Sequence, residues 1–161
     1  MKKNNAEESK GPSNHYRGLE ELKLSCPEGT SLSGPADQNG LIVTVNGQCE
    51  AACISSEGVR NGSFIRWYEN GNKAVQGSYS NDRKSGEWTY WSPTGHITGK
   101  GNFYNDRPDG KWQTWYENGQ KESEGEYEQG IQQGKFIYWD DKNNISKILH
   151  YENGNIMKSE I

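Results

Sequence analysis

Four glutamates at alternate positions are the residues here with the clearest capacity for chemistry. In an extended strand, residues two apart share a face and lie about 7 Å from each other. Carboxylates in such a row repel one another unless a cation offsets them. The row therefore indicates either a solvated, solubility-giving face or a docking site for a Lys/Arg-rich partner. Its members are Glu122, Glu124, Glu126 and Glu128.

The other reactive residues form no recognisable catalytic or metal-binding pattern. The three histidines, His15, His96 and His150, occupy unrelated positions, and Cys49-x3-Cys53 lacks a histidine partner for zinc. There is no glycine-rich phosphate loop and no nucleophile elbow. We therefore predict no enzyme, no cofactor and no metal.

The three cysteines are an odd number and cannot all pair within one chain. Cys26 opens a Gly/Pro/Ser-rich loop, and a Cys26–Cys53 disulfide would staple that loop to the rest of the chain. Three free thiols in the cytosol are the alternative.

Composition points to a folded chain with an aromatic core. The 161 residues include 6 Trp and 9 Tyr, and the formal net charge is only −4, whereas disordered chains avoid aromatic residues. No apolar run approaches the ~18 residues of a membrane-spanning helix. The acidic balance argues against a nucleic-acid binder and against contact of the repeats with anionic lipid.

An internal repeat of 24 residues positions nearly all of these aromatic residues. Four units cover 62–157. The spacing is kept by Trp67, Trp91, Trp115 and Trp139, by Gly62, Gly86, Gly110 and Gly134, and by the rings at 64, 88, 112 and 136 and at 79, 103, 127 and 151.

Each unit reads as a β-hairpin. A short strand ends in a turn such as Tyr-Glu-Asn-Gly at 68–71, a longer strand follows, and a second turn closes the unit, as at 105–110. If the glutamate row faces water, then Gly125 and Tyr127 face inward, and Gly77 and Gly101 leave room for rings to lie on the backbone. The repeated Trp falls on the opposite face unless a bulge intervenes.

The flanking segments complete the predicted organisation. Residues 1–23 are a polar tail or tether, and 24–61 hold an N-terminal capping hairpin, with strands at 41–45 and 48–54, and a degenerate first repeat. Residues 158–161 form a short tail. The fold class is all-β, with tandem hairpins in an elongated, twisted antiparallel meander.

The units at 62–71 and 110–119, each followed by Gly-x-Tyr, resemble MORN repeats, and more narrowly the bacterial MORN variant of toxin–antitoxin and immunity-like proteins. The resemblance implies tandem hairpins without catalytic residues. It also implies binding roles, among them neutralising a partner toxin.

We therefore expect a non-enzymatic protein-binding module, an antitoxin or immunity protein whose partner is another protein, with a basic protein as the candidate that the glutamate row suggests. The alternative is an exported or surface-anchored structural or adhesive protein that contacts glycan or host material. Export, with a signal already removed, is slightly favoured over the cytoplasm, because the stretch from Cys26 into the repeats is similar to bacterial lipoproteins.

Overall fold

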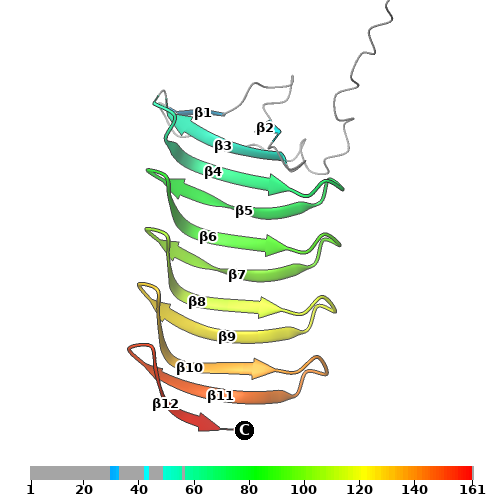
Figure 1. The fold of residues 1–161 in the computed structure, drawn as a ribbon, viewed down its shortest axis with the longest axis vertical. Helices are drawn as coiled ribbons and strands as arrows, with labels where there is room; N and C mark the ends of the chain where they lie inside the picture. Colours follow the sequence, from blue (N-terminus) through cyan, green and yellow to red (C-terminus); the bar gives the residue numbers. More distant parts are fainter. Residues whose placement is uncertain (1–29, 33–41, 44–48, 56, 161) are drawn as a thin grey trace, which may run out of the picture.

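The computed structural model describes residues 30–32, 42–43, 49–55 and 57–160, and these form one open, twisted antiparallel sheet (Figure 1). Neighbours in the chain are neighbours in the sheet from β3 to β12, while β1 and β2 both pair with β3. The described residues contain no helix, so the predicted all-β meander is confirmed. The strands are β1 Thr30–Leu32, β2 Ile42–Val43, β3 Cys49–Ser55, β4 Arg60–Trp67, β5 Lys73–Ser80, β6 Arg83–Trp91, β7 Ile97–Tyr104, β8 Arg107–Trp115, β9 Lys121–Glu128, β10 Ile131–Trp139, β11 Ile145–Glu152 and β12 Asn155–Glu160.

The turn predicted over 105–110 is shorter than expected. Asn105 and Asp106 make the whole connection, with φ of 49° and 66°, and β8 begins at Arg107. Asn and Asp tolerate this left-handed geometry, which a tight hairpin requires. Gly110 instead lies inside β8 with a φ of +84°, close to the register shift between β7 and β8.

One face of the sheet carries the two repeated series of rings that begin at Phe64 and Tyr79, as predicted. Trp88 is 1% exposed and Phe64 is 2% exposed. The Tyr79 ring stands edge-on to both, with centroids 5.1 Å from Trp88 and 5.2 Å from Phe64. The same edge-to-face contact recurs between Phe103 and Trp112. We call this surface the ring face.

The two repeated glycine rows serve different purposes. A Cβ added to Gly77, Gly101 or Gly125 would lie 2.2–2.4 Å from the ring that follows in the next strand, which confirms the predicted role of this row. A Cβ at Gly86 would meet nothing within 4 Å, but the residue has a φ of +71°. This second row is glycine because of backbone conformation, not space.

The repeated tryptophans lie on the opposite face, which we call the polar face. Trp91 lines a depression there together with Thr89 and Gln76, and the Lys121 ammonium lies 5.5 Å from the Trp139 ring. Side chains therefore alternate regularly between the two faces from each ring-face residue, such as Trp88, to the repeated tryptophan three positions later. Trp67, the first of the series, is fully buried.

The fourth unit departs from the others at Leu149, which stands where the earlier units have Gly125 and its equivalents. The residue that would supply the next ring is Glu160, which instead contacts His150 and Lys158. With no ring to accommodate, the position tolerates a leucine, which is 7% exposed. The repeated series of rings on the ring face thus ends at β11.

Three sequence expectations concern the N-terminal segments. The antiparallel pairing of β2 with β3 agrees with a hairpin here, and its capping role stays a prediction. The tail at 1–23 and the Cys26 end of the Cys26–Cys53 disulfide lie outside the described residues.

Candidate functional site: the polar face at β9 and β10

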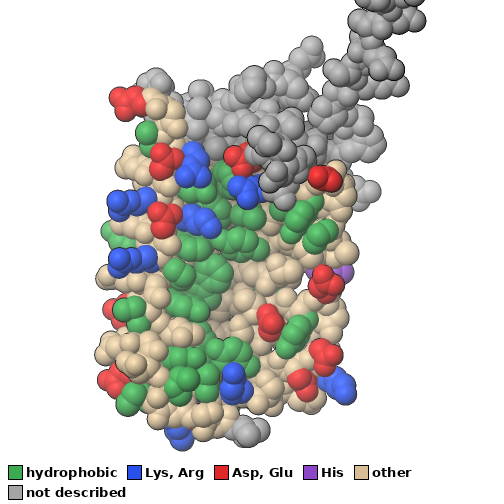
Figure 2. Space-filling model, viewed as in Figure 1, with side chains coloured by type: hydrophobic (Ala, Val, Ile, Leu, Met, Phe, Trp, Pro, Cys, Tyr) green, Lys and Arg blue, Asp and Glu red, His purple; other side chains and the backbone are tan. Residues whose placement is uncertain are grey.

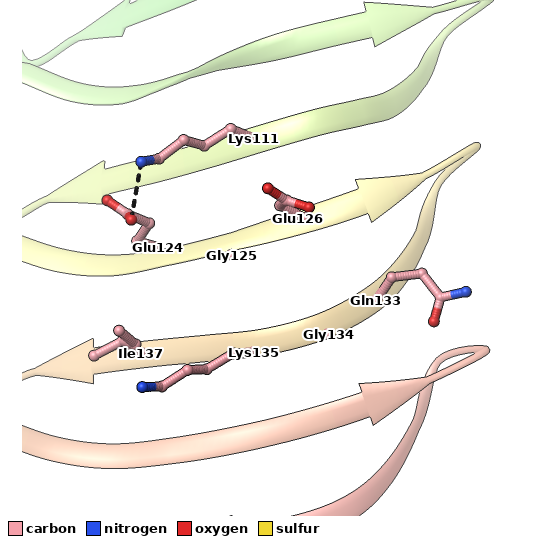
Figure 3. A pocket seen from close by; sticks show the side chains of 8 residues that line it. All are labelled: Lys111, Glu124, Gly125, Glu126, Gln133, Gly134, Lys135 and Ile137. Carbon is pink, nitrogen blue, oxygen red and sulfur yellow. Dashed lines mark ion pairs between the residues drawn. The ribbon is translucent and has the colours of Figure 1, made fainter.

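The two faces of the sheet differ in chemistry. Figure 2, drawn from the same side as Figure 1, shows hydrophobic side chains gathered in a column that crosses the strands. In Figure 3 the strands keep their order down the picture but run in the reverse direction, so that view shows the other face. That face presents Lys111, Glu124 and Glu126, and it is therefore the polar face.

The structure places three of the four predicted glutamates on this face. Glu124, Glu126 and Glu128 alternate with Gly125 and Tyr127 along β9, as expected. Glu126 and Glu128 are exposed, while Glu124 is half-buried. The carboxylates of the row therefore differ in exposure. The side chains that contact each one decide whether it can bind a further group.

Glu124 is already neutralised by its own protein. Its carboxylate accepts hydrogen bonds from Lys121 Nζ at 2.6 Å and from Gln113 Nε2 at 2.7 Å, and it pairs with Lys111 Nζ at 2.9 Å. The Lys121 ammonium, followed by that of Lys111, lowers the pKa of Glu124 to about 2. These two lysines offset the repulsion expected within the row.

Glu126 keeps its charge available. Among the described residues it makes no ion pair, and it lies at a depression of about 300 Å³ between β9 and β10 (Figure 3). Lys111, Glu124, Gln133, Lys135 and Ile137 also line this depression. Glu128 lies 3.5 Å from the Gln133 amide nitrogen at the limit of a hydrogen bond.

Glu122 lies near the start of β9, where its charge acts on Tyr116. Burial raises the pKa of the Tyr116 hydroxyl, and the charges of Glu122, Asp141 and Asp140 raise it further. Asp140 itself accepts backbone hydrogen bonds from Lys142 and Asn144 at 3.0 and 2.8 Å. Asp140 therefore holds a turn, while Glu122 lies in β9.

Contacts that join one unit to the next were missed by the sequence reasoning. The Tyr68 hydroxyl donates to the Trp91 carbonyl at 2.7 Å, and Tyr116 repeats this contact with Trp139 at 2.8 Å. At the opposite edge, the Asp82 carboxylate accepts from the Arg60 backbone N–H at 3.0 Å. The repetition of Tyr-Glu-Asn-Gly was the available signal, but a turn motif alone does not reveal a contact one unit away.

The part of the chain that the structure describes offers little that resembles a reaction centre. Within it, no three His, Cys, Asp or Glu side chains converge on a metal-sized site. Nor do the described residues include a helix long and apolar enough to cross a membrane.

Comparison with known proteins agrees with the repeat geometry. Residues 60–81, 84–106 and 108–129 match the family described as MORN repeat variant. Each matched segment holds the strand pair of one unit, and the fourth unit, which has Leu149 in place of glycine, lies beyond the matched residues. No curated protein matches the chain. The three matched segments are therefore similar to MORN repeats, a type of repeat that generally serves binding.

Proposed function

We propose that this MORN repeat module binds another protein and that the polar face at β9 and β10 contacts a basic segment of that partner. The observation that carries the proposal is the contrast between two neighbouring carboxylates. Glu124 is saturated by Lys111, Lys121 and Gln113, whereas Glu126 is exposed beside a depression and makes no ion pair among the described residues. A basic side chain that enters the depression could pair with the Glu126 carboxylate.

The surroundings of Glu126 favour a protein partner over a small cation. Lys135 lines the same depression and has no ion pair within the described residues, so side chains of both charge signs line it. Such a mixed pattern sets the register of a partner that carries complementary charges. The net charge of −4 adds a long-range attraction for a basic partner.

The resemblance to antitoxin and immunity-like variants makes a protein toxin the first partner to test, and the module would neutralise it by covering its surface. The proposal assigns no catalytic step to the repeats.

The test is a calorimetric titration of the full chain with a candidate toxin encoded beside its gene. We expect binding that weakens about tenfold or more in the Glu126→Gln/Glu128→Gln variant and that falls with added salt. Glu87→Gln is the matched control, because Glu87 is exposed on the same face and pairs with Lys100 at 3.0 Å. Equal affinity of the double variant and the parent would place the site elsewhere.

A further inference from the structure

A second depression lies on the polar face, between β5 and β6. It measures about 340 Å³, and its lining includes Ser63, Gln76, Ser78, Glu87, Thr89 and Trp91. Several of its positions are those of the β9–β10 depression two units earlier, since Gln76 corresponds to Glu124 and Thr89 to Ile137. Both depressions occur where the strand register shifts. The two depressions thus share a backbone irregularity but are lined by different types of side chain.

Among the described residues that line the β5–β6 depression, none carries an unpaired charge, but the Lys73 ammonium lies beside it, 3.4 Å from the Gln76 amide oxygen and 6.0 Å from the centroid of the Trp91 ring. The one carboxylate of the lining, Glu87, pairs with Lys100 Nζ at 3.0 Å. The β9–β10 depression is lined by Lys111, Glu124 and Lys135. The equivalent positions of the β5–β6 depression hold Ser63, Gln76 and Glu87. A metal cation would find no unpaired carboxylate among the lining residues. The lining therefore suits an uncharged ligand.

The depression is nevertheless rich in hydrogen-bonding groups. Within the part of the chain that the structure describes, the hydroxyls of Ser63, Ser78 and Thr89 have no hydrogen-bond partner. The Gln76 amide oxygen accepts only a long bond of 3.4 Å from Lys73, and its nitrogen remains available. Hydroxyl and amide groups both donate and accept, so this lining matches a ligand that carries many hydroxyls.

Trp91 adds an apolar wall to this polar lining. Its indole is half-buried and lines the depression. A flat aromatic ring favours a ligand that presents C–H groups on its face and polar groups at its edge. The volume, at the lower end of the range for small-molecule sites, suits one ring of a chain rather than a large cofactor.

We propose that the β5–β6 depression binds a neutral saccharide of the β-linked glucopyranose type. Such a sugar carries hydroxyls around its edge and C–H groups on both faces. Trp91 stacks on one face, while Gln76 and the serine and threonine hydroxyls bind the edge. This activity is separate from protein binding at Glu126, because the two depressions lie at different strand pairs.

The test is an NMR titration of the full chain with cellotetraose, with the acyclic polyol sorbitol as comparison. We expect saturable shifts, with millimolar affinity, that cluster at the indole N–H of Trp91 and at the amides of β5 and β6. Sorbitol should give none. Trp91→Ala should weaken binding about tenfold or more, as the loss of a stacking platform does elsewhere.

Three further variants separate binding from folding. Thr89→Val keeps the side-chain shape and removes one hydroxyl, and it should weaken binding severalfold with an unchanged spectrum elsewhere. Trp139→Ala, at the equivalent position two units on, should leave the affinity unchanged, as should Glu126→Gln. The absence of saturable shifts with cellotetraose, or an equal loss in Trp91→Ala and Trp139→Ala, would overturn the proposal.

Discussion

The indole of Trp88 lies on the backbone of Gly77, so closely that a Cβ at Gly77 would be 2.2 Å from Cδ2 of the ring. The ring also donates from Nε1 to the Ser78 carbonyl at 3.1 Å. This stacking of a ring on a glycine in the preceding strand recurs with Trp112 on Gly101 and Phe136 on Gly125. It lets a single sheet bury large rings without a second layer among the described residues.

Gly77→Ala should destabilise the protein by about 3 kcal/mol, near the upper end for overpacking, because the new methyl group would displace the Trp88 indole. Gly86→Ala is the matched control, and its cost of about 1–2 kcal/mol would come from its left-handed φ of +71° alone. Urea unfolding measures both. Asn tolerates this φ, so Gly86→Asn should recover part of the loss, whereas Gly77→Asn should not. Recovery at both positions would show that the ring contact is not the cause.

Trp88→Ala should cost about 3–5 kcal/mol, as expected for a large side chain that is 1% exposed. Neighbouring units should unfold with it, because each repeat packs on the next. Lys111→Ala, on the polar face, removes one half-exposed ion pair and should cost at most about 1 kcal/mol. Denaturant unfolding followed by aromatic circular dichroism checks both values. Similar losses in the two variants would contradict the assignment of faces.

Tyr68→Phe and Tyr116→Phe should each cost about 1 kcal/mol, because each removes one hydrogen bond between successive units. Hydrogen exchange should quicken around the turn whose carbonyl loses its donor, at Trp91 in the first variant and at Trp139 in the second. Tyr104→Phe is the control, since Tyr104 is 60% exposed, and it should be neutral. Uniformly faster exchange throughout the sheet would instead indicate a global effect.

The stabilisation that Glu124 supplies should disappear in acid. The pKa of this carboxyl in the folded protein is about 2, below its ordinary 4.5, so its contribution is present above pH 4.5 and is lost as the pH falls towards 2. The parent protein should exceed Glu124→Gln in stability by at most about 1 kcal/mol at pH 7, and the gap should close over that interval. NMR titration should also show that Lys111→Ala raises the pKa of Glu124. An unchanged gap at pH 2 would mean that charge is not the source.

Much of the fold is predictable from the chain because its determinants are local. Strand alternation places Gly125 and Tyr127 together on one face, and the 24-residue spacing aligns each glycine with a ring in the next strand. The fourth unit was predicted from its aromatic phase even though Leu149 replaces the glycine there. Backbone preferences and side-chain period depend on neighbours in the chain, which the sequence displays directly.

The properties of the candidate site depended on the tertiary structure. Four glutamates in a row look equivalent in the sequence, yet Lys111 from β8 and Lys121 from β9 both reach Glu124 and leave Glu126 without an ion pair among the described residues. Which cation meets which carboxylate is set by cross-strand register, and a slip of one residue would turn every side chain to the other face. The register shifts between β5 and β6 and between β9 and β10, and the two depressions lie at these shifts. Their placement depends on how neighbouring strands pair, which no single strand encodes.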